Sequence, residues 1–196
     1  FLPLSLAIAL LSGTVGRFSD RNGARLPIAA GSLIVASAFA GLALLSGSGL
    51  HEFWSGVFPL MVLMGLGMAL VVSPLSTAVM VAVDDVDTGA ASGINNAVSR
   101  VAGLIAVAAM GGVATSRYAA SFPEGRGGAP GFGEQPATAL SSETEALRVA
   151  ASDAAFSSVA WTAAVLCVLA AILAWKTTPG AKAAKALSGQ RHAELA

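Results

Sequence analysis

The sequence predicts an all-α integral membrane protein with about five transmembrane helices. Hydrophobic residues make up 55% of the 196-residue chain, and the mean hydropathy is +0.74. Charged residues make up only 11%, whereas a soluble domain carries about 25%. Several stretches without a charge reach the roughly 20 residues that a helix needs to cross a bilayer. We expect these segments to be helical, because lipid cannot satisfy the backbone of an open strand, and no ~10-residue alternating segments typical of a membrane barrel are visible.

Composition also excludes several classes of function. The 11 Lys and Arg residues balance the 11 Asp and Glu residues, so there is no basic excess for binding nucleic acid. So few charges cannot cover the surface of a soluble enzyme, and so apolar a chain is not disordered. The single Cys167 excludes an internal disulfide framework and a multi-cysteine metal site. Residue 1 is Phe rather than Met, so we expect the chain to be a fragment of a longer protein.

Five spans are expected along the chain. The first is short, and a signal peptide is the alternative. That alternative is weaker, because no basic residue precedes the stretch and the segment from Arg17 to Arg21 follows it where small cleavage-site residues belong. The fourth run is interrupted only by Arg100. The expected spans are about 1–16, 26–46, 56–82, 89–115 and 154–175.

The distribution of Lys and Arg predicts the orientation. Five crossings place loop 17–25, the acidic loop 84–87 and the C-terminal tail on the same side of the membrane. That side carries seven basic residues, and the other side carries three, all in the long loop 116–153. Because basic loops stay in the cytoplasm, we expect loop 17–25 and the tail 177–196 to be cytoplasmic, with loop 116–153 external. The acidic loop argues weakly against this orientation. The expected location is the plasma (inner) membrane.

The long loop divides into two parts. Residues 122–137 are rich in Pro and Gly, which predicts an irregular segment. The sequence Ser142-Glu-Thr-Glu145 then matches a capping box, which indicates the start of a short helix running towards the last span. A plain solvated connector is the alternative.

The segment from Gly16 to Arg25 is the most informative of the short loops. Gly16 allows a helix to end and a neighbour to approach closely, and Gly23 supplies a backbone conformation that other residues resist. Asp20 is a lone carboxylate among three arginines, and Arg21 and Arg25 can pair with acids or with lipid phosphates.

This pattern, G-x-x-x-D-R-x-G-x-R between two spans, resembles the signature loop of the major facilitator superfamily of transporters. It departs from that loop only at Ala24, where the family often has a basic residue. In that family the loop follows the second span of each six-helix half, and its carboxylate helps to stabilise the outward-facing state. The alternative is a topological turn with no mechanical role. The resemblance implies a gating role for Gly16, Asp20, Arg21, Gly23 and Arg25.

A second stretch is similar to the late helices of one branch of that superfamily. Pro74-Leu-Ser-Thr-Ala and the segment from Gly89 to Gly103 resemble the fourteen-spanner drug:proton antiporters, which export drugs and antiseptics. The resemblance implies that residues 1–176 are part of a C-terminal transmembrane half, followed by the cytoplasmic tail. It also implies that the N-terminal half of the same chain is missing and that protons are the coupling ion.

Polar residues within the expected spans are candidates for a transport path. Arg100 is the only ionisable residue in a span, and a cation at the bilayer centre costs about 2.5–3.5 kcal/mol on insertion scales, so we expect it to face the protein interior or a cavity. The alternative is that the asparagines only hydrogen-bond between helices while Arg100 snorkels to the interface. The candidates for the path are Arg100, Asn95, Asn96, Ser99, Ser73, Ser76 and Thr77.

Glycine and proline positions predict close packing and a kink. Gly89 and Gly93 have the small-xxx-small spacing of close helix contacts, and Gly65 and Gly67 suggest the same one span earlier. Pro74 removes a backbone donor inside its span and favours a kink there.

These features together predict a secondary active transporter that exports drug-like or other small organic compounds in exchange for protons. The proton is implied by the resemblance alone, because no carboxylate lies in the spans. The alternatives are a major facilitator transporter of a metabolite, for uptake or export, and a non-transporting membrane scaffold. We expect no enzyme activity, cofactor, metal or nucleic acid; the expected partners are the lipid bilayer and a small-molecule substrate.

Overall fold

The computed structural model describes residues 13, 15, 16, 19, 23–48, 53–81, 87–122, 130–136 and 139–178, without the side chains of 76–81. Most of the first expected span and the tail from residue 179 lie outside the described residues. So do Asp20 and Arg21 of the predicted gating loop, and the side chains of Ser76 and Thr77.

The described chain is all helical, as the composition predicts, and has no strand in those residues. The four helices are α2 (Arg25–Gly47), α3 (Phe58–Val81), α4 (Thr88–Ser121) and α5 (Ser142–Thr177), with a π-helical turn, Phe53–Val57, before α3. Each is long and apolar enough to cross a membrane. The all-α membrane fold class is therefore confirmed.

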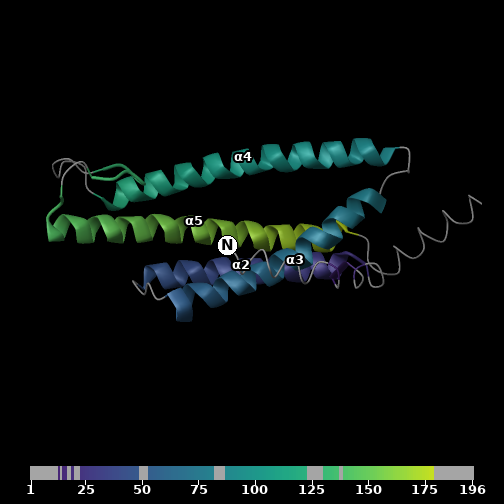
Figure 1. Ribbon diagram of the computed structural model, residues 1–196, viewed down its shortest axis with the longest axis horizontal. Helices are drawn as coiled ribbons and strands as arrows, with labels where there is room; N and C mark the ends of the chain where they lie inside the picture. Colours follow the sequence, from purple (N-terminus) through teal and green to yellow (C-terminus); the bar gives the residue numbers. More distant parts are fainter. Residues whose placement is uncertain are drawn as a thin grey trace, which may run out of the picture.

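Helix α2 packs against α5 and α3, and α5 lies between α2 and α4 (Figure 1). Helices α2 and α5 run antiparallel in a single register. Ser157 Oγ donates to the carbonyl oxygen of Ala43 at 3.1 Å, and Ser46 Oγ donates to that of Asp153 at 3.1 Å. Every buried residue of α5 is alanine. Small side chains allow the two backbones to approach, which is how membrane helices associate without a hydrophobic driving force.

The crossing of α2 and α3 depends on two glycines. A methyl group on Gly31 would lie 2.7 Å from the carbonyl oxygen of Gly67, and one on Gly67 would lie 2.8 Å from that of Gly31. Backbone faces backbone at this point, with no room for a side chain on either helix. The close packing expected at Gly67 is confirmed.

Helices α4 and α5 are longer than the spans expected from hydropathy. They have 34 and 36 residues, or about 51 and 54 Å at 1.5 Å per residue, whereas the hydrocarbon core is about 30 Å thick. Helix α5 begins at Ser142 and continues without a break through the last span. The solvated connector is therefore wrong, and the helix start is confirmed.

The capping residue of α5 differs from the expected one. Ser141 rather than Ser142 is the N-cap, and its side chain accepts a hydrogen bond from the backbone N–H of Thr144 at 3.2 Å. Glu145 is therefore one position too late for a capping box and pairs with Arg148 instead.

The ends of α4 and α5 form a small core of their own. Tyr118 stacks on Phe122 with ring centroids 5.7 Å apart, and its hydroxyl donates to the carbonyl oxygen of Pro130 at 3.2 Å. Helix α5 begins eleven residues before Asp153, whose carbonyl oxygen accepts the hydrogen bond of Ser46 near the end of α2, so α5 projects about 16 Å past α2. Figure 1 shows this projection at the left. The core consists of Ala114, Tyr118, Phe122, Ala151 and Ala155, with Leu147 and Val159 packed against it.

Candidate functional site

The predicted gating loop, residues 17–25, ends in a tight turn that leads into α2. The backbone N–H of Gly23 donates to the carbonyl oxygen of Ser19 at 2.7 Å, and Gly23 has a φ of 85°. Only glycine adopts this left-handed region readily. Both residues are buried, so the turn is packed against protein. The backbone conformation expected of Gly23 is present.

Gly16, the residue directly before this loop, approaches α3. A methyl group on Gly16 would lie 3.1 Å from Ser73 Oγ, which is closer than an ordinary contact. Ser73 directly precedes Pro74, which is fully buried inside a helix that continues through it. The structure therefore brings together Gly16 of the gating pattern and Ser73 of the transport-path candidates.

The end of the loop contacts α5 through Trp175, a residue that the sequence did not indicate as part of the site. Arg25 is the first residue of α2, and its Cζ lies 4.2 Å from the centroid of the Trp175 ring. This distance is well within the range of a cation–π interaction. The Nε atom of Arg25 is buried and has no hydrogen-bond partner among the described residues. Trp175 could be recognised from the sequence only as an aromatic residue at a span end; its partner is 150 positions away.

The polar residues of α4 form a second group. Arg100 Nε donates to Asn96 Oδ1 at 3.4 Å, one turn earlier on the same helix. This distance is long for a hydrogen bond, so the contact is weak. Both side chains are exposed, as is Ser99, while Asn95 is partly buried. The structure thus brings Arg100 and Asn96 together along one helix, whereas Ser73 lies on another.

The first half of α4 is uncovered in the described part of the chain. Methyl groups on Gly89 and Gly93 would meet no atom within 4 Å, so close packing at these glycines stays a prediction. Apolar side chains surround Arg100 on the rest of this surface, which suits contact with lipid or with another helix. The exposed apolar residues are Ile94, Val98, Val101, Leu104, Ile105 and Val107.

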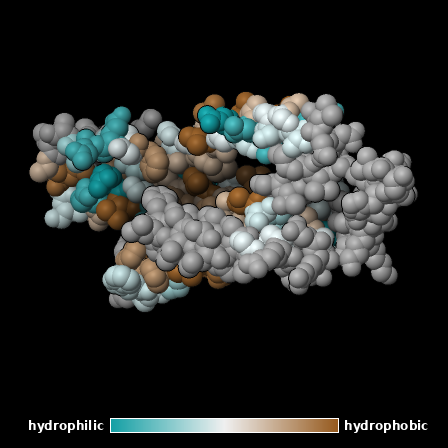
Figure 2. Space-filling model, turned by 45° about the vertical axis from the view of Figure 1, so that its right-hand side comes forward, coloured by the Kyte–Doolittle hydropathy of each residue, from teal (hydrophilic) through white to brown (hydrophobic). Residues whose placement is uncertain are grey.

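Charged groups at the start of α5 make the other electrostatic feature. Arg148 binds Glu145 with two hydrogen bonds, Nη2 to Oε1 at 2.6 Å and Nε to Oε2 at 2.9 Å. The hydrogen bond from Arg148 lowers the pKa of Glu145, and the carboxylate in turn raises the pKa of Arg148. Figure 2 shows hydrophilic residues gathered at the end of the molecule where α4 and α5 meet the loop, next to a hydrophobic band.

No three His, Cys, Asp or Glu residues group together in the part of the chain that the structure describes, so these residues contain no candidate set of metal ligands. The polar features of the described residues are a loop turn, a cation on an aromatic ring, an arginine with an asparagine, and the ion pair of Arg148 with Glu145.

Comparison with known proteins places the chain beside a drug resistance protein. Over 121 residues, or 62% of this chain, it is 36% identical to proteins named multidrug resistance protein Stp from two strains of Mycobacterium tuberculosis. The matched region covers 22% of each relative, so the chain spans about a fifth of the length of the curated relatives that it matches. No protein-family model matches the chain. With four helices of membrane-crossing length among the described residues, the chain is a multi-pass membrane protein similar to part of a multidrug resistance protein.

Proposed function

We propose that this chain is part of a secondary active transporter that exports drug-like or other small organic compounds in exchange for protons. The observation that carries the proposal is the 36% identity to multidrug resistance protein Stp over 121 residues, or 62% of this chain. Proton coupling and the fourteen-spanner branch come from the resemblance of the gating loop and of the Gly89–Gly103 stretch. Residues 1–176 would then be part of the C-terminal transmembrane half.

The gating role falls on the loop 17–25. Its turn is held by Gly23, its beginning lies against Ser73 of α3, and its end lies on Trp175 of α5. Because the loop packs against two different helices, a change in the relative position of these helices would move the loop or break one of its contacts. We propose that Asp20 uses this placement to stabilise the outward-facing state, with the loop on the cytoplasmic side.

The substrate path is assigned to the polar side of α4. Arg100 and Asn96 are exposed on a helix that also exposes many apolar side chains, and leaving a cation against lipid costs about 2.5–3.5 kcal/mol on insertion scales. This cost favours a position where Arg100 faces a water-filled path or pairs with an anionic group outside the described residues. Residues 116–153 would face the exterior and residues 177–196 the cytoplasm of the inner membrane.

Export of ethidium from cells that make the full-length protein tests the proposal. We expect export that stops when a protonophore collapses the proton gradient. Uptake instead of export would favour the metabolite transporter, and no movement of any tested compound would favour the scaffold. Export that continues without a proton gradient would refute proton coupling.

Two pairs of variants test the residues. Asp20→Asn should impair export at near-normal abundance, whereas the control Asp87→Asn, an exposed residue before α4, should not. Arg100→Ala should reduce export more than abundance, with partial rescue by Arg100→Lys if charge alone matters. The control is Arg117→Ala, an exposed arginine on the same helix. Full export by Asp20→Asn and Arg100→Ala would remove both residues from the mechanism.

A further inference from the structure

The contact between Arg25 and Trp175 joins the end of the gating loop to the end of the last helix. The guanidinium lies face-on to the indole at 4.2 Å, and a cation within about 6 Å of a Trp ring is attracted by the negative face of its π system. The Arg25 Nε has no hydrogen-bond partner among the described residues. Among the described residues, the indole ring of Trp175 is the group that lies against the guanidinium of Arg25.

The position of Trp175 depends on the register of α2 and α5, which hydrogen bonds at the other end of this helix pair fix. From Arg25 to Ala43 is 18 positions along α2, and from Trp175 to Ser157 is 18 positions back along α5, so both contacts belong to one antiparallel register. The hydrogen bonds of Ser157 and Ser46 lie about 30 Å from Arg25 along α2. The far end of the helix pair is held by these bonds, and the near end is held by the cation on the ring.

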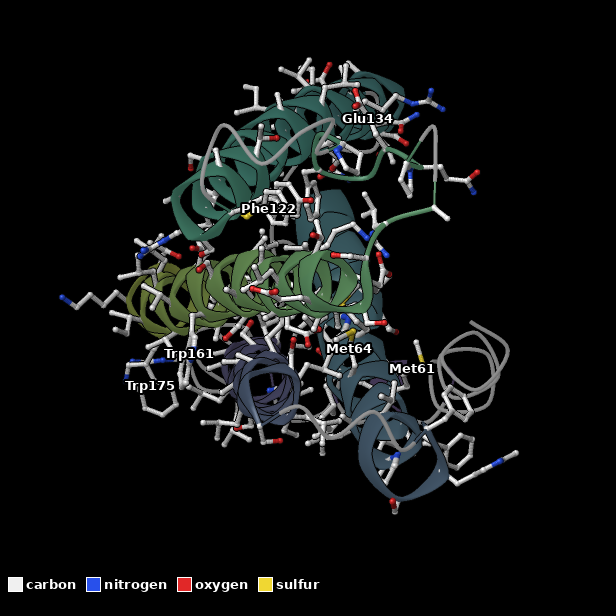
Figure 3. The ribbon with its side chains drawn as sticks, turned by 90° about the vertical axis from the view of Figure 1, so that its left-hand side faces the viewer. Met61, Met64, Phe122, Glu134, Trp161 and Trp175 are labelled. Atoms are coloured by element: carbon white, nitrogen blue, oxygen red, sulfur yellow. The ribbon has the colours of Figure 1, made fainter. Side chains whose placement is uncertain are left out.

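The contact is at the edge of the packed region, where it can open. Trp175 is 51% exposed, so about half of its surface is free of contact with the rest of the protein. Figure 3 shows Trp175 beside the junction of α2 and α5, on the same flank as Trp161. A contact at this edge costs little to break compared with the alanine-lined interface, so it can change while α2 and α5 stay together.

We propose that Trp175 is a positioning residue: through its contact with Arg25 it holds the C-terminal end of the gating loop against α5 and so couples the loop to the last helix. The positioning itself follows from the geometry, and its effect on export rests on the proposed function of the loop. Trp175 does not contact substrate in this proposal.

The first test measures the accessibility of the loop. The full-length protein carries Cys167→Ser and Ala24→Cys, is purified in detergent so that both faces are open, and reacts with a polar maleimide. We expect Trp175→Leu and Arg25→Gln each to raise the labelling rate about 2- to 10-fold, the range that corresponds to cation–π energies at partly exposed sites. The double variant should label no faster than the faster single variant, because both changes remove the same contact. Trp175→Phe keeps an aromatic face and should remain within about 2-fold of the parent.

Trp161→Leu is the matched control, since Trp161 lies on the same helix and flank and no described cation lies over its ring. It should leave labelling unchanged. Labelling of Trp175→Leu at the parental rate, or single effects that multiply in the double variant, would overturn the proposal. The Arg25→Gln variant gives the same information if Trp175→Leu does not fold.

Ethidium export by the same variants separates the two proposals. If labelling rises and export falls together, with rescue of both by Trp175→Phe, both proposals stand. If labelling rises and export is unchanged, Trp175 positions the loop but the loop does not control export. If export falls while labelling is unchanged, the positioning role is refuted whatever the loop does.

Discussion

The crossing of α2 and α3 makes the sharpest prediction about stability. A methyl group on Gly67 would lie 2.7 Å from Val35 Cγ2, 2.8 Å from the carbonyl oxygen of Gly31 and 3.0 Å from the backbone nitrogen of Val35. Carbon atoms in contact prefer about 3.5–4.0 Å, so Gly67→Ala requires a shift of about 0.8 Å or more. Two of the three atoms are backbone, and Val35 is stiff at χ1 in a helix. The helices must therefore move apart.

The loss of stability caused by Gly67→Ala can be estimated by comparison with a glycine that has open space around it. Overpacking of this kind costs about 1–3 kcal/mol, while replacing glycine by alanine within a helix returns about 1 kcal/mol. Gly103→Ala in α4 is the matched control, because a methyl group there meets no described atom within 4 Å. The gain in helix propensity is common to both variants and cancels in their difference. Gly67→Ala should therefore be about 1–3 kcal/mol less stable than Gly103→Ala.

The measurement is thermal unfolding of the full-length protein in detergent, followed by tryptophan fluorescence. We expect Gly67→Ala to melt below Gly103→Ala, because the melting temperature falls in proportion to the lost stability. Adding Val35→Ala should restore part of the difference, because it removes one of the three close atoms and leaves the carbonyl of Gly31 in place. Equal melting temperatures for the two alanine variants would refute this account of the crossing.

Three further predictions concern the projecting end of α4 and α5 and the orientation of the chain. Cysteine at Ser121 should react with a membrane-impermeant maleimide in intact cells and cysteine at Ser188 should not; the reverse pattern would invert the proposed topology. Tyr118→Phe should increase hydrogen exchange in residues 130–136, because it removes the hydrogen bond to the carbonyl of Pro130, worth about 0.5–1.5 kcal/mol; unchanged exchange would count against that bond. The pKa of Glu145 is lowered in the folded protein by its pair with Arg148. The pair therefore stabilises the start of α5 at any pH above the ordinary carboxyl pKa, and this stabilisation is lost as the pH falls through the lowered pKa. Arg148→Gln should move the carboxylate titration, followed by NMR, back up towards its ordinary midpoint, and a midpoint that does not move would refute the pairing.

The sequence by itself determined the features that depend on local composition. Apolar runs without charge predict helices of membrane length, because hydropathy and backbone satisfaction in lipid act on each segment separately. The positive φ of Gly23 is likewise a property of one residue in one turn. The start of the last helix was different: hydropathy reports only the part of a helix that lies in lipid, so the eleven residues of α5 before Asp153 could be read as either helix or connector.

Only the tertiary structure decided which helices meet and where. Glycine spacing suggested close contacts at Gly89 and Gly93 as well as at Gly67, but of these three glycines only Gly67 meets another backbone among the described residues. Small residues permit an approach without specifying a partner, so the partner depends on how distant segments are arranged. The same reason explains Arg25 and Trp175, which are 150 positions apart and lie together because α2 and α5 share one antiparallel register.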